Sequence, residues 1–289
     1  MMLSWLERPF AGIFQGIPVG WQAVIERAYI RLLSLGIGEL PDARPDAAEV
    51  EATRALSIIV PVHNAPRETR RCLDALERFA GHAEVILVDD GSTDADARSV
   101  VLEYACRNGW KRHRNEAGSY HSGACTDGVR LATRPILCLL NSDTVVTQCA
   151  WSLSIRALQK PGGPIAVVPG MSAGPGSQSD VRAWRCRRAW NDATIFAYAA
   201  YRRRRFGARS ARRARGFLGG AAFFVRRTDW DRVGGFSGCR AHYGNDVDLC
   251  AKLVAGGGWL GVCDGDYIHH LAGCSSAASA QPAGQSACG

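Results

Sequence analysis

The fold is decided between residues 56 and 143, where the chain reads LSIIVPV (56–62), EVILVDD (84–90) and ILCLLNSD (136–143). These runs are short and almost continuously apolar, and they alternate with stretches of helical spacing around 66–79, 95–107 and 122–132. Strands that are apolar on both faces and joined by helices are typical of a parallel sheet covered on both sides. We therefore predict an α/β domain with a Rossmann-like, mostly parallel sheet flanked by helices.

Polar residues end each of the three runs. They are His63-Asn64, Asp89-Asp90 and Asn141-Ser142-Asp143. Parallel strands place their carboxyl ends at one edge of the sheet, where ligands of such sheets bind, so we expect these residues to form one site. The first strand is followed by HNAPRETR, which contains neither the G-x-G-x-x-G nor the G-x-x-x-x-G-K-[ST] pattern. This excludes a dinucleotide oxidoreductase and a P-loop enzyme.

The remaining segments have different compositions. Residues 1–40 predict an N-terminal amphipathic helical segment, because apolar residues recur at helical spacing from Trp21 to Leu33. Residues 41–55 are rich in Pro, Ala and acidic residues and predict a linker. The main domain should then span 56–275, and the Ala, Ser, Gln and Gly of 276–289 predict a disordered tail.

Charge and cysteine content indicate the surroundings of the protein. The net charge is +8, and twelve arginines lie in 182–215, within a predicted basic helical insert at 181–215. The eleven cysteines are odd in number, scattered, and partly placed in apolar runs, as Cys138 is in ILCLL. This usage favours reduced thiols in the cytoplasm. Neither a leader pattern nor an apolar stretch of about 18 residues is present, so we expect no membrane span.

Six motifs then follow one another in a single order. They are SIIVPVHN, EVILVDDGSTD, LLNSDT, GGAAFFVRR, YGNDVDLCAKL and YIHHLAGCS. Together, over about residues 56–275, they resemble the family-2 glycosyltransferases with the GT-A fold. The resemblance implies inverting, hexosyltransferase-type transfer of a sugar from a UDP- or dTDP-sugar to a glycan or lipid-linked acceptor. It implies a nucleotide-binding half at 56–145 and an acceptor half at 146–275.

The resemblance assigns the nucleotide contacts to the first half. The residues concerned are Pro61, Val62, Asn64, Asp90 and Ser142. An ionised carboxylate such as Asp90 can accept a charge-assisted bond from the imide N–H of uracil or from ribose hydroxyls. For Asp89 and Asp94 an alternative stays open, in which they form a turn and cap the next helix.

NSDT occupies the position of the family's metal-binding motif, and the resemblance implies that Asp143 is a ligand of Mn²⁺ or Mg²⁺. A divalent cation there would neutralise the charge of a leaving diphosphate. Asn141 stands where the first carboxylate would be, so further ligands are needed. The late motif YIHH offers one histidine, because successive strand residues point to opposite faces. We favour His270 over His269, and a carboxylate with an imidazole suits Mn²⁺ somewhat better than Mg²⁺.

YGNDVDL places Asp246 where the family carries its catalytic base, at the predicted start of a helix. Inverting transfer needs a carboxylate to remove the proton of the acceptor hydroxyl. Asn245 stands where a Glu is usual, and Asp248 is expected to cap or pair on the helix. Gly219 and Gly220 resemble glycines that let the backbone approach the donor sugar or acceptor, although they could equally mark a bulge.

The basic segment leaves several partners open. Arginines interleaved with aromatic residues could bind nucleic acid, lie on an anionic membrane, or be merely solvated. The resemblance favours peripheral contact with the inner face of the cytoplasmic membrane and no nucleic acid, in keeping with polysaccharide biosynthesis. Because Asn141 and Asn245 replace acidic residues, a non-catalytic relative that binds sugar nucleotides or glycans is the main alternative.

Overall fold

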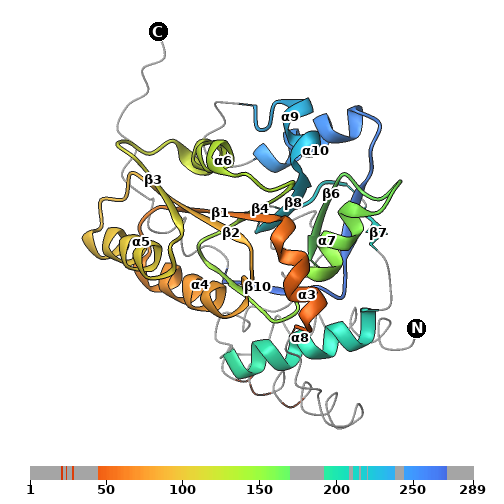
Figure 1. The fold of residues 1–289 in the computed structure, drawn as a ribbon, viewed down its shortest axis with the longest axis horizontal. Helices are drawn as coiled ribbons and strands as arrows, with labels where there is room; N and C mark the ends of the chain where they lie inside the picture. The colour runs from red at the N-terminus through yellow and green to blue at the C-terminus, as the bar shows by residue number, and fades with distance from the viewer. Residues whose placement is uncertain are drawn as a thin grey trace.

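A computed structural model gives the fold (Figure 1). It describes residues 21, 24, 28, 45–169, 192–207, 211–214, 216–219, 221–237 and 244–271. Their main feature is an eight-stranded sheet with the order β3-β2-β1-β4-β8-β6-β9-β7. The strands are β1 (Leu56–Val62), β2 (Glu84–Asp90), β3 (Lys111–Asn115), β4 (Ile136–Leu140), β6 (Ala166–Pro169), β7 (Arg212–Arg213), β8 (Ala222–Arg226) and β9 (Leu260–Cys263).

The sheet is mostly parallel. β1 pairs in parallel with β2 and β4, and β2 with β3, whereas β8 runs antiparallel between β4 and β6. All seven residues of β1 and all five of β4 are buried, as expected for strands covered on both faces. The predicted α/β fold with a mostly parallel sheet is confirmed. β3 could not be predicted from the sequence, because KRHRN is polar and its strand lies at the edge of the sheet.

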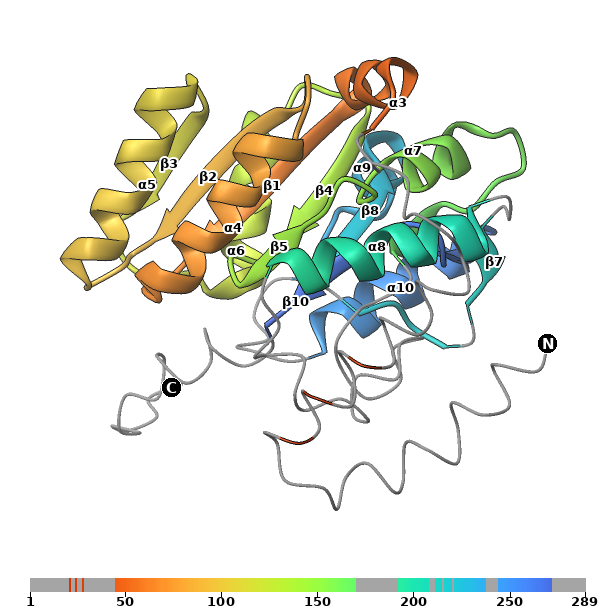
Figure 2. The same ribbon diagram turned by 90° about the horizontal axis from the view of Figure 1, so that it is seen from below.

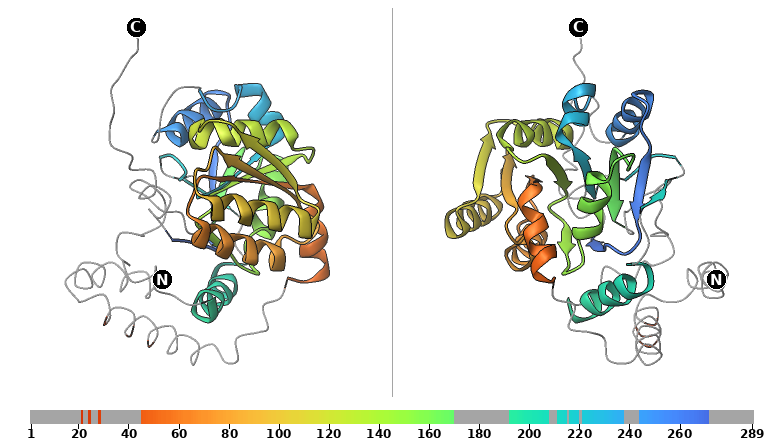
Figure 3. Two further views of the ribbon diagram at one scale, coloured as in Figure 1. Left: turned by 90° about the vertical axis from the view of Figure 1, so that its left-hand side faces the viewer. Right: turned by 45° about the vertical axis from the view of Figure 1, so that its right-hand side comes forward.

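Helices cover both faces of this sheet (Figure 1, Figure 3). One face packs against α4 (Pro66–Phe79), α5 (Ala95–Asn108), α7 (Ser152–Gln159) and α8 (Asp192–Phe206). The other packs against α6 (Tyr120–Leu131), α9 (Arg227–Val233) and α10 (Asn245–Ala255). The helices expected around 66–79, 95–107 and 122–132 are therefore present as α4, α5 and α6, with ends that differ by two residues or fewer.

The predicted linker is wrong in its second half. Asp46 accepts a hydrogen bond from Glu49 N (2.8 Å) in a capping box that starts helix α3 (Ala47–Ala52), and a 3₁₀ turn follows at Thr53–Ala55. Glu49 also accepts a bond from Ser152 Oγ (2.6 Å) and pairs with Arg203, so α3 is fixed to α7 and α8. Capping residues, rather than an apolar face, make this short helix.

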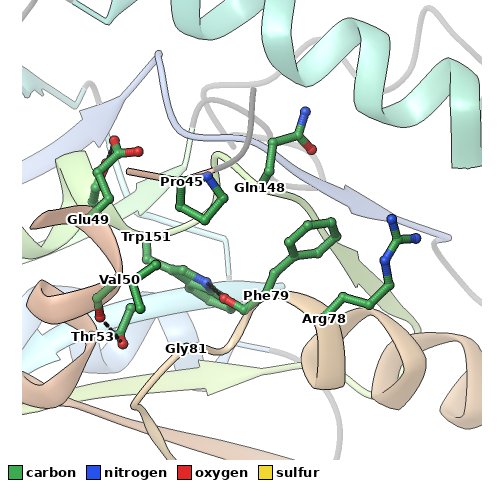
Figure 4. A pocket seen from close by; sticks show the side chains of 10 residues that line it. Pro45, Glu49, Val50, Thr53, Arg78, Phe79, Gly81, Gln148 and Trp151 are labelled. Atoms are coloured by element: carbon green, nitrogen blue, oxygen red, sulfur yellow. Dashed lines mark hydrogen bonds between the residues drawn. The ribbon is translucent and has the colours of Figure 1, made fainter. Parts of the chain in front are cut away.

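A small pocket lies where α3 meets the end of α4 and the start of α7 (Figure 4). Its volume is about 40 Å³, enough for water but far too small for a sugar nucleotide. Trp151 closes one side and donates a hydrogen bond from Nε1 to the carbonyl of Phe79 (2.7 Å). The contact helps to hold α4 and α7 together.

The predicted basic insert is not helical throughout, because part of it forms the edge strand β7, antiparallel to β9. Its described arginines contact the protein itself. Arg202 and Arg203 on α8 donate to the carbonyls of Asp264 (2.8 Å) and Gly265 (3.2 Å), and Arg212 pairs with the Asp264 carboxylate (2.5 Å). At least part of the basic charge therefore forms contacts within the protein. Figure 2 shows α8 lying across one side of the domain.

Predictions for the two ends of the chain are only partly covered. Trp21, Val24 and Ala28 are helical, as predicted for the N-terminal segment, and their side chains are exposed. The rest of 1–40 and the tail 276–289 lie outside the described residues.

Candidate functional site

The carboxyl ends of β1, β2 and β4 lie at one edge of the sheet, and the polar residues after β1 and β2 contact one another there. Nδ1 of His63 lies 2.8 Å from the carbonyl oxygen of Asp90, and the backbone N–H of Asn64 donates to Ser92 Oγ (3.0 Å). The clusters after β1 and β2 are therefore in contact, and the cluster after β4 follows a strand that is parallel to β1.

Backbone strain is concentrated at the same edge. Three non-glycine residues in the described part of the chain have positive φ: Asn64 (55°), Ala65 (53°) and Tyr120 (61°). Asn64 and Ala65 follow β1, and Tyr120 begins α6 after β3. Such conformations cost about 1–3 kcal/mol each and cluster at functional sites. Gly91 (φ 66°) has to be glycine, because a Cβ there would lie 2.7 Å from Gly118 N. Its loop can thus touch the loop after β3.

Asp90 sits at the centre of this contact and is almost fully buried. Its Oδ1 accepts three hydrogen bonds, from Asn115 Nδ2 (2.8 Å), Ser119 N (2.8 Å) and Ser119 Oγ (2.7 Å). All of its side-chain hydrogen bonds to described residues end on that one oxygen. The carboxylate is therefore held in a fixed orientation by Oδ1, which leaves Oδ2 as the acceptor for a ligand.

The neighbouring carboxylates build the loop. Asp89 accepts from Ser92 N (2.9 Å) with Oδ1 and pairs with Arg114 through Oδ2. Asp94 caps α5 by accepting from Asp96 N (2.8 Å) and Ala97 N (3.3 Å). Asp89 therefore stabilises the turn after β2 and Asp94 caps the next helix, which is the alternative that the sequence left open for these two residues.

The other four expected nucleotide contacts are placed differently from Asp90. The side-chain oxygen of Asn64 accepts from the backbone N–H groups of Thr93 and Asp94 (both 3.0 Å), so it fastens two loops together. Val62 has no exposed surface, and its side chain packs in the hydrophobic core. Pro61 is buried within β1, and Ser142 is buried beside Asp143.

Asp143 and His270 face each other across a second, two-stranded sheet. β5 (Thr144–Val146) and β10 (Ile268–His270) run antiparallel, with His270 opposite Thr144, and Leu271 N donates to the Asp143 carbonyl (2.9 Å). This register places His270 Nε2 at 3.0 Å from Asp143 Oδ1. His269 points the other way, into the core, with Nδ1 at 3.1 Å from Tyr267 Oη. The orientation favoured for the two histidines is the one observed.

This pair fits part of a divalent cation site. Two ligands at right angles around an octahedral Mg²⁺, with bonds of about 2.1 Å, lie about 3.0 Å apart, which matches the spacing of His270 Nε2 and Asp143 Oδ1. A carboxylate oxygen and an imidazole nitrogen also suit Mn²⁺. The described residues hold no group of three or more His, Cys, Asp or Glu that could bind a metal. A cation at Asp143 would need further oxygens from a ligand or water.

Asn141, the residue in place of the first carboxylate, connects this pair to α6. Its Nδ2 lies 3.3 Å from His270 Nε2, and its Oδ1 lies 3.1 Å from Nε2 of His121. No role had been assigned to residues 114–128 from the sequence, so His121, Asn115 and Ser119 were all missed. The one sequence feature that could have identified them is the position of Asn115 at the carboxyl end of a strand. That strand, β3, could not be recognised because its residues are polar.

Asp246 lies on the first turn of α10, where the helix dipole favours a carboxylate. α10 packs in the same hydrophobic cluster as α6, through Leu249 and Leu253 on α10 and Cys125 on α6. Burial raises the pKa of the Cys125 thiol, and the charges of Asp246 and Asp90 raise it further. Asn245 is buried at the start of the same helix.

The segment before β8, from Leu218 to Ala221, contacts both α10 and the end of β4. Leu218 N donates to Cys250 Sγ on α10 (3.4 Å), and the Ala221 carbonyl accepts from Asn141 N (3.1 Å). Gly219 is buried between these two contacts, whereas Gly220 lies outside the described residues. The segment before β8 therefore links α10, which carries Asp246, to the carboxyl end of β4, which Asp143 follows.

Comparisons with known proteins concern the same region. The model of "Glycosyl transferase family 2" matches residues 57–236, more than half of the chain. The match includes Asp90 and Asp143 and ends before Asp246 and His270.

Two curated relatives are glycosyltransferases. Over 163 residues (55% of this chain), the chain is 28% identical to validoxylamine A glucosyltransferase of Streptomyces hygroscopicus subsp. limoneus. Over 98 residues (34% of this chain), it is 30% identical to the uncharacterized glycosyltransferase YibD of Escherichia coli K12. These matches span only 34% and 28% of the relatives' own lengths.

Solved structures share the fold. A structure of GalNAc-T7 with UDP, GalNAc and Mn²⁺ superposes with a TM-score of 0.57 at 18% identity, over 75% of this chain and 43% of that one. S. aureus TarS 1–349 gives 0.52 at 15% identity, over 74% and 59%. The mannosyltransferase PcManGT of Pyrobaculum calidifontis, in complex with GDP-Man and Mn²⁺, gives 0.50 at 16% identity, over 86% and 69%. At these identities the likeness establishes the GT-A fold alone.

Proposed function

Because the chain belongs to glycosyl transferase family 2, we propose that it transfers a hexose from a nucleoside-diphosphate sugar, with inversion, to a glycan or lipid-linked acceptor. The proposal is supported by the carboxyl edge of the sheet, which Asp90 and the Asp143–His270 pair follow, and by the packing of α10, which carries Asp246, against the same face as α6. Asp90 suits a base and ribose, Asp143 suits a diphosphate with its cation, and Asp246 suits an acceptor hydroxyl.

Asp90 and the Asp143–His270 pair hold the sugar-nucleotide donor. Oδ2 of Asp90 accepts the imide N–H of the base or a ribose hydroxyl, and we propose uracil or thymine as that base. Backbone groups of Pro61 and Val62, together with Asn64 and Ser142, line the same nucleotide site. Asp143 and His270 would hold Mn²⁺ or Mg²⁺, which would neutralise the charge of the diphosphate. Further ligand oxygens would have to come from the diphosphate and water.

Asp246 activates the acceptor. The Asp246 carboxylate removes the proton of the acceptor hydroxyl as its oxygen attacks the anomeric carbon, on the face opposite the leaving diphosphate. It lies on the first turn of α10, where the helix dipole favours a carboxylate. Asn245 and the glycines Gly219 and Gly220 shape the space for the donor sugar and the acceptor.

A role in polysaccharide biosynthesis at the inner face of the cytoplasmic membrane accords with this reaction. The exposed Trp21, Val24 and Ala28 share one face of a helix at the i, i+3, i+7 spacing of an amphipathic surface helix, which supports peripheral contact. No described helix has the length and apolar character that crossing a bilayer requires. Arginines used within the fold weaken a membrane or nucleic-acid role for that part of the basic segment.

The variant Asp246→Asn tests the reaction. We expect turnover to fall at least ~100-fold, the usual contribution of a general base, while nucleotide affinity stays unchanged. Asp248→Asn, on the same helical turn, is the matched control and should keep turnover. Unchanged turnover in Asp246→Asn would refute the base, and a wild-type protein that binds sugar nucleotides without transferring sugar would favour the non-catalytic alternative.

A further inference from the structure

A groove lies at the edge of the sheet opposite the candidate site, where β4 begins and β8 ends. The two strands are antiparallel with Arg226 opposite Ile136, and both of these residues line the groove. The candidate site follows the other end of β4, after Leu140. At about 3.3 Å per residue, the two ends of this strand lie about 13 Å apart. The groove is therefore separate from the edge that carries Asp90 and Asp143.

We propose that this groove is a second ligand site, which binds a phosphorylated sugar, either as a free sugar phosphate or as part of a nucleotide. The volume of the groove is about 640 Å³. Sites for small organic ligands typically have volumes of about 300–1,000 Å³. The inference goes beyond the proposed transfer reaction and does not depend on it.

The groove is strongly basic. Of the eleven described residues that line it, four are cations and none is acidic; the cations are Arg134, Lys160, Arg226 and Arg227. Arg134 and Lys160 are exposed, and neither side chain has a hydrogen bond or ion pair to a described residue. Exposed Lys and Arg side chains are commonly only solvated, so these two alone would not indicate a site. The two arginines beside them are held differently.

Arg226 is fixed by bonds whose direction is certain, because a guanidinium has five N–H donors and no acceptor. Its Nε donates to Asp229 Oδ2 (2.6 Å), and its Nη1 donates to the carbonyl of Leu158 (3.0 Å). Its Nη2 makes no hydrogen bond to a described residue and is not buried. Asp229 is also shared with Arg232 (3.1 Å), so it offsets the charge of Arg226 only in part. Arg226 therefore presents oriented donors and positive charge to the groove.

Arg227 is held by backbone carbonyls at the end of α6. Its Nη2 donates to the carbonyls of Val129 (3.0 Å) and Ala132 (2.7 Å). Carbonyl groups satisfy these donors without cancelling the charge. The carboxylate that pairs with Arg227 is that of Asp231, which lies 3.9 Å from Nη1 and is 58% exposed. Such an exposed pair contributes little, so most of the charge of Arg227 is available to an anion.

The remaining lining residues indicate the class of ligand. Ile136 and Leu158 are buried and form an apolar floor against which the C–H groups of a sugar ring can pack. The exposed side chains of Gln159 and Thr228 can each donate to and accept from ring hydroxyls. A phosphate ester carries about −1.5 to −2 charge at pH 7 and three acceptor oxygens. It therefore matches several cations better than a single carboxylate does.

The test is equilibrium dialysis of labelled glucose 1-phosphate and AMP, each in the presence of EDTA. EDTA keeps a divalent cation from the proposed donor site, and adenine lacks the imide N–H that Asp90 is proposed to accept. We expect at least one of the two probes to bind wild-type protein with a Kd below ~1 mM. Binding of glucose 1-phosphate alone would identify a free sugar phosphate as the ligand, and binding of AMP alone would identify a nucleotide.

The double variant Arg134→Gln, Lys160→Gln locates the site. Both side chains are exposed and support no contact in the fold, so the variant should fold normally, which thermal unfolding checks. We expect it to bind the probe at least ~10-fold more weakly than wild type, because hydrogen bonds to charged groups are lost. The matched control is Arg112→Gln with Arg204→Gln, which removes the same charge from exposed positions outside the groove and should bind as wild type does.

Three results would overturn the inference. The first is that neither probe binds wild-type protein. The second is that the two double variants lose affinity equally, which would show that net charge alone attracts the probe. The third is that sulfate displaces the probe as effectively as the unlabelled sugar phosphate does, because the groove would then hold any small anion. None of these results bears on the proposed transfer reaction, which is tested with Mn²⁺ present.

Discussion

The variant Asp90→Asn separates the structural use of this side chain from its proposed use in binding. Oδ1 of Asp90 accepts three hydrogen bonds, from Asn115 and from both the N–H and the hydroxyl of Ser119. An asparagine can keep all three on its amide oxygen, so the loop should hold its shape. The other atom, however, changes from a carboxylate oxygen into an NH₂ group, and a donor then faces the donor groups of the nucleotide.

The expected magnitude follows from that exchange. Hydrogen bonds to charged groups contribute about 1.5–3 kcal/mol, which corresponds to a loss of ~10- to 150-fold in nucleotide affinity. Isothermal titration calorimetry of UDP and dTDP, with thermal unfolding as a check on the fold, measures both effects. Asp89→Asn is the matched control: it removes charge from the Arg114 pair and should lower stability more than nucleotide affinity. Unchanged nucleotide affinity in Asp90→Asn would refute the binding role of Oδ2.

Three further predictions concern other parts of the molecule. Although burial of Glu84 raises its pKa, bonds from Lys111 (2.6 Å) and from Ser57 and Thr133 hold it at about 2, below the ordinary 4.5. Its stabilising contribution, about 3 kcal/mol at most, is therefore complete above pH 4.5 and lost as the pH falls toward 2; urea unfolding of Glu84→Gln should accordingly show a loss at pH 7 that shrinks near pH 3. Arg203→Met leaves the fully buried Asp266 without its cation (now 2.9 Å away) and should cost about 3–5 kcal/mol in urea unfolding. Asp143→Ala should abolish Mn²⁺-dependent stabilisation by UDP in thermal unfolding, and a shift equal to that of wild type would exclude it as a ligand.

Much of the fold could be predicted because its strands carry their own signal. β1, β2 and β4 are apolar on both faces, and the helices between them show regular periodicity, so the parallel core followed from local pattern. β3 and α3 could not be predicted in that way. β3 is a polar edge strand stabilised by pairing with β2, and α3 is a six-residue helix that depends on a capping box and on Glu49 reaching α7 and α8.

The site was predictable where strand ends determine it and obscure where tertiary contacts do. Asp90 and Asp143 follow apolar strands, so topology alone places them at one edge. The pairing of β10 with β5 decides which histidine faces Asp143, and alternation along a strand limits that choice to His269 or His270. His121 reaches Asn141 only through the placement of α6, which no local pattern specifies.

The central claim is that this edge of the sheet binds a nucleoside-diphosphate sugar together with a divalent cation. The most direct measurement is thermal unfolding of the wild-type protein with a panel of UDP-, dTDP- and GDP-sugars, each with and without Mn²⁺. Saturating one-site binding at about 100 times the Kd adds about 2.7 kcal/mol of stability, enough to shift the midpoint by several degrees. The account predicts that at least one donor, with UDP- and dTDP-sugars favoured, gives such a shift only when Mn²⁺ is present. A panel in which no sugar nucleotide stabilises the protein, with or without Mn²⁺, would contradict it.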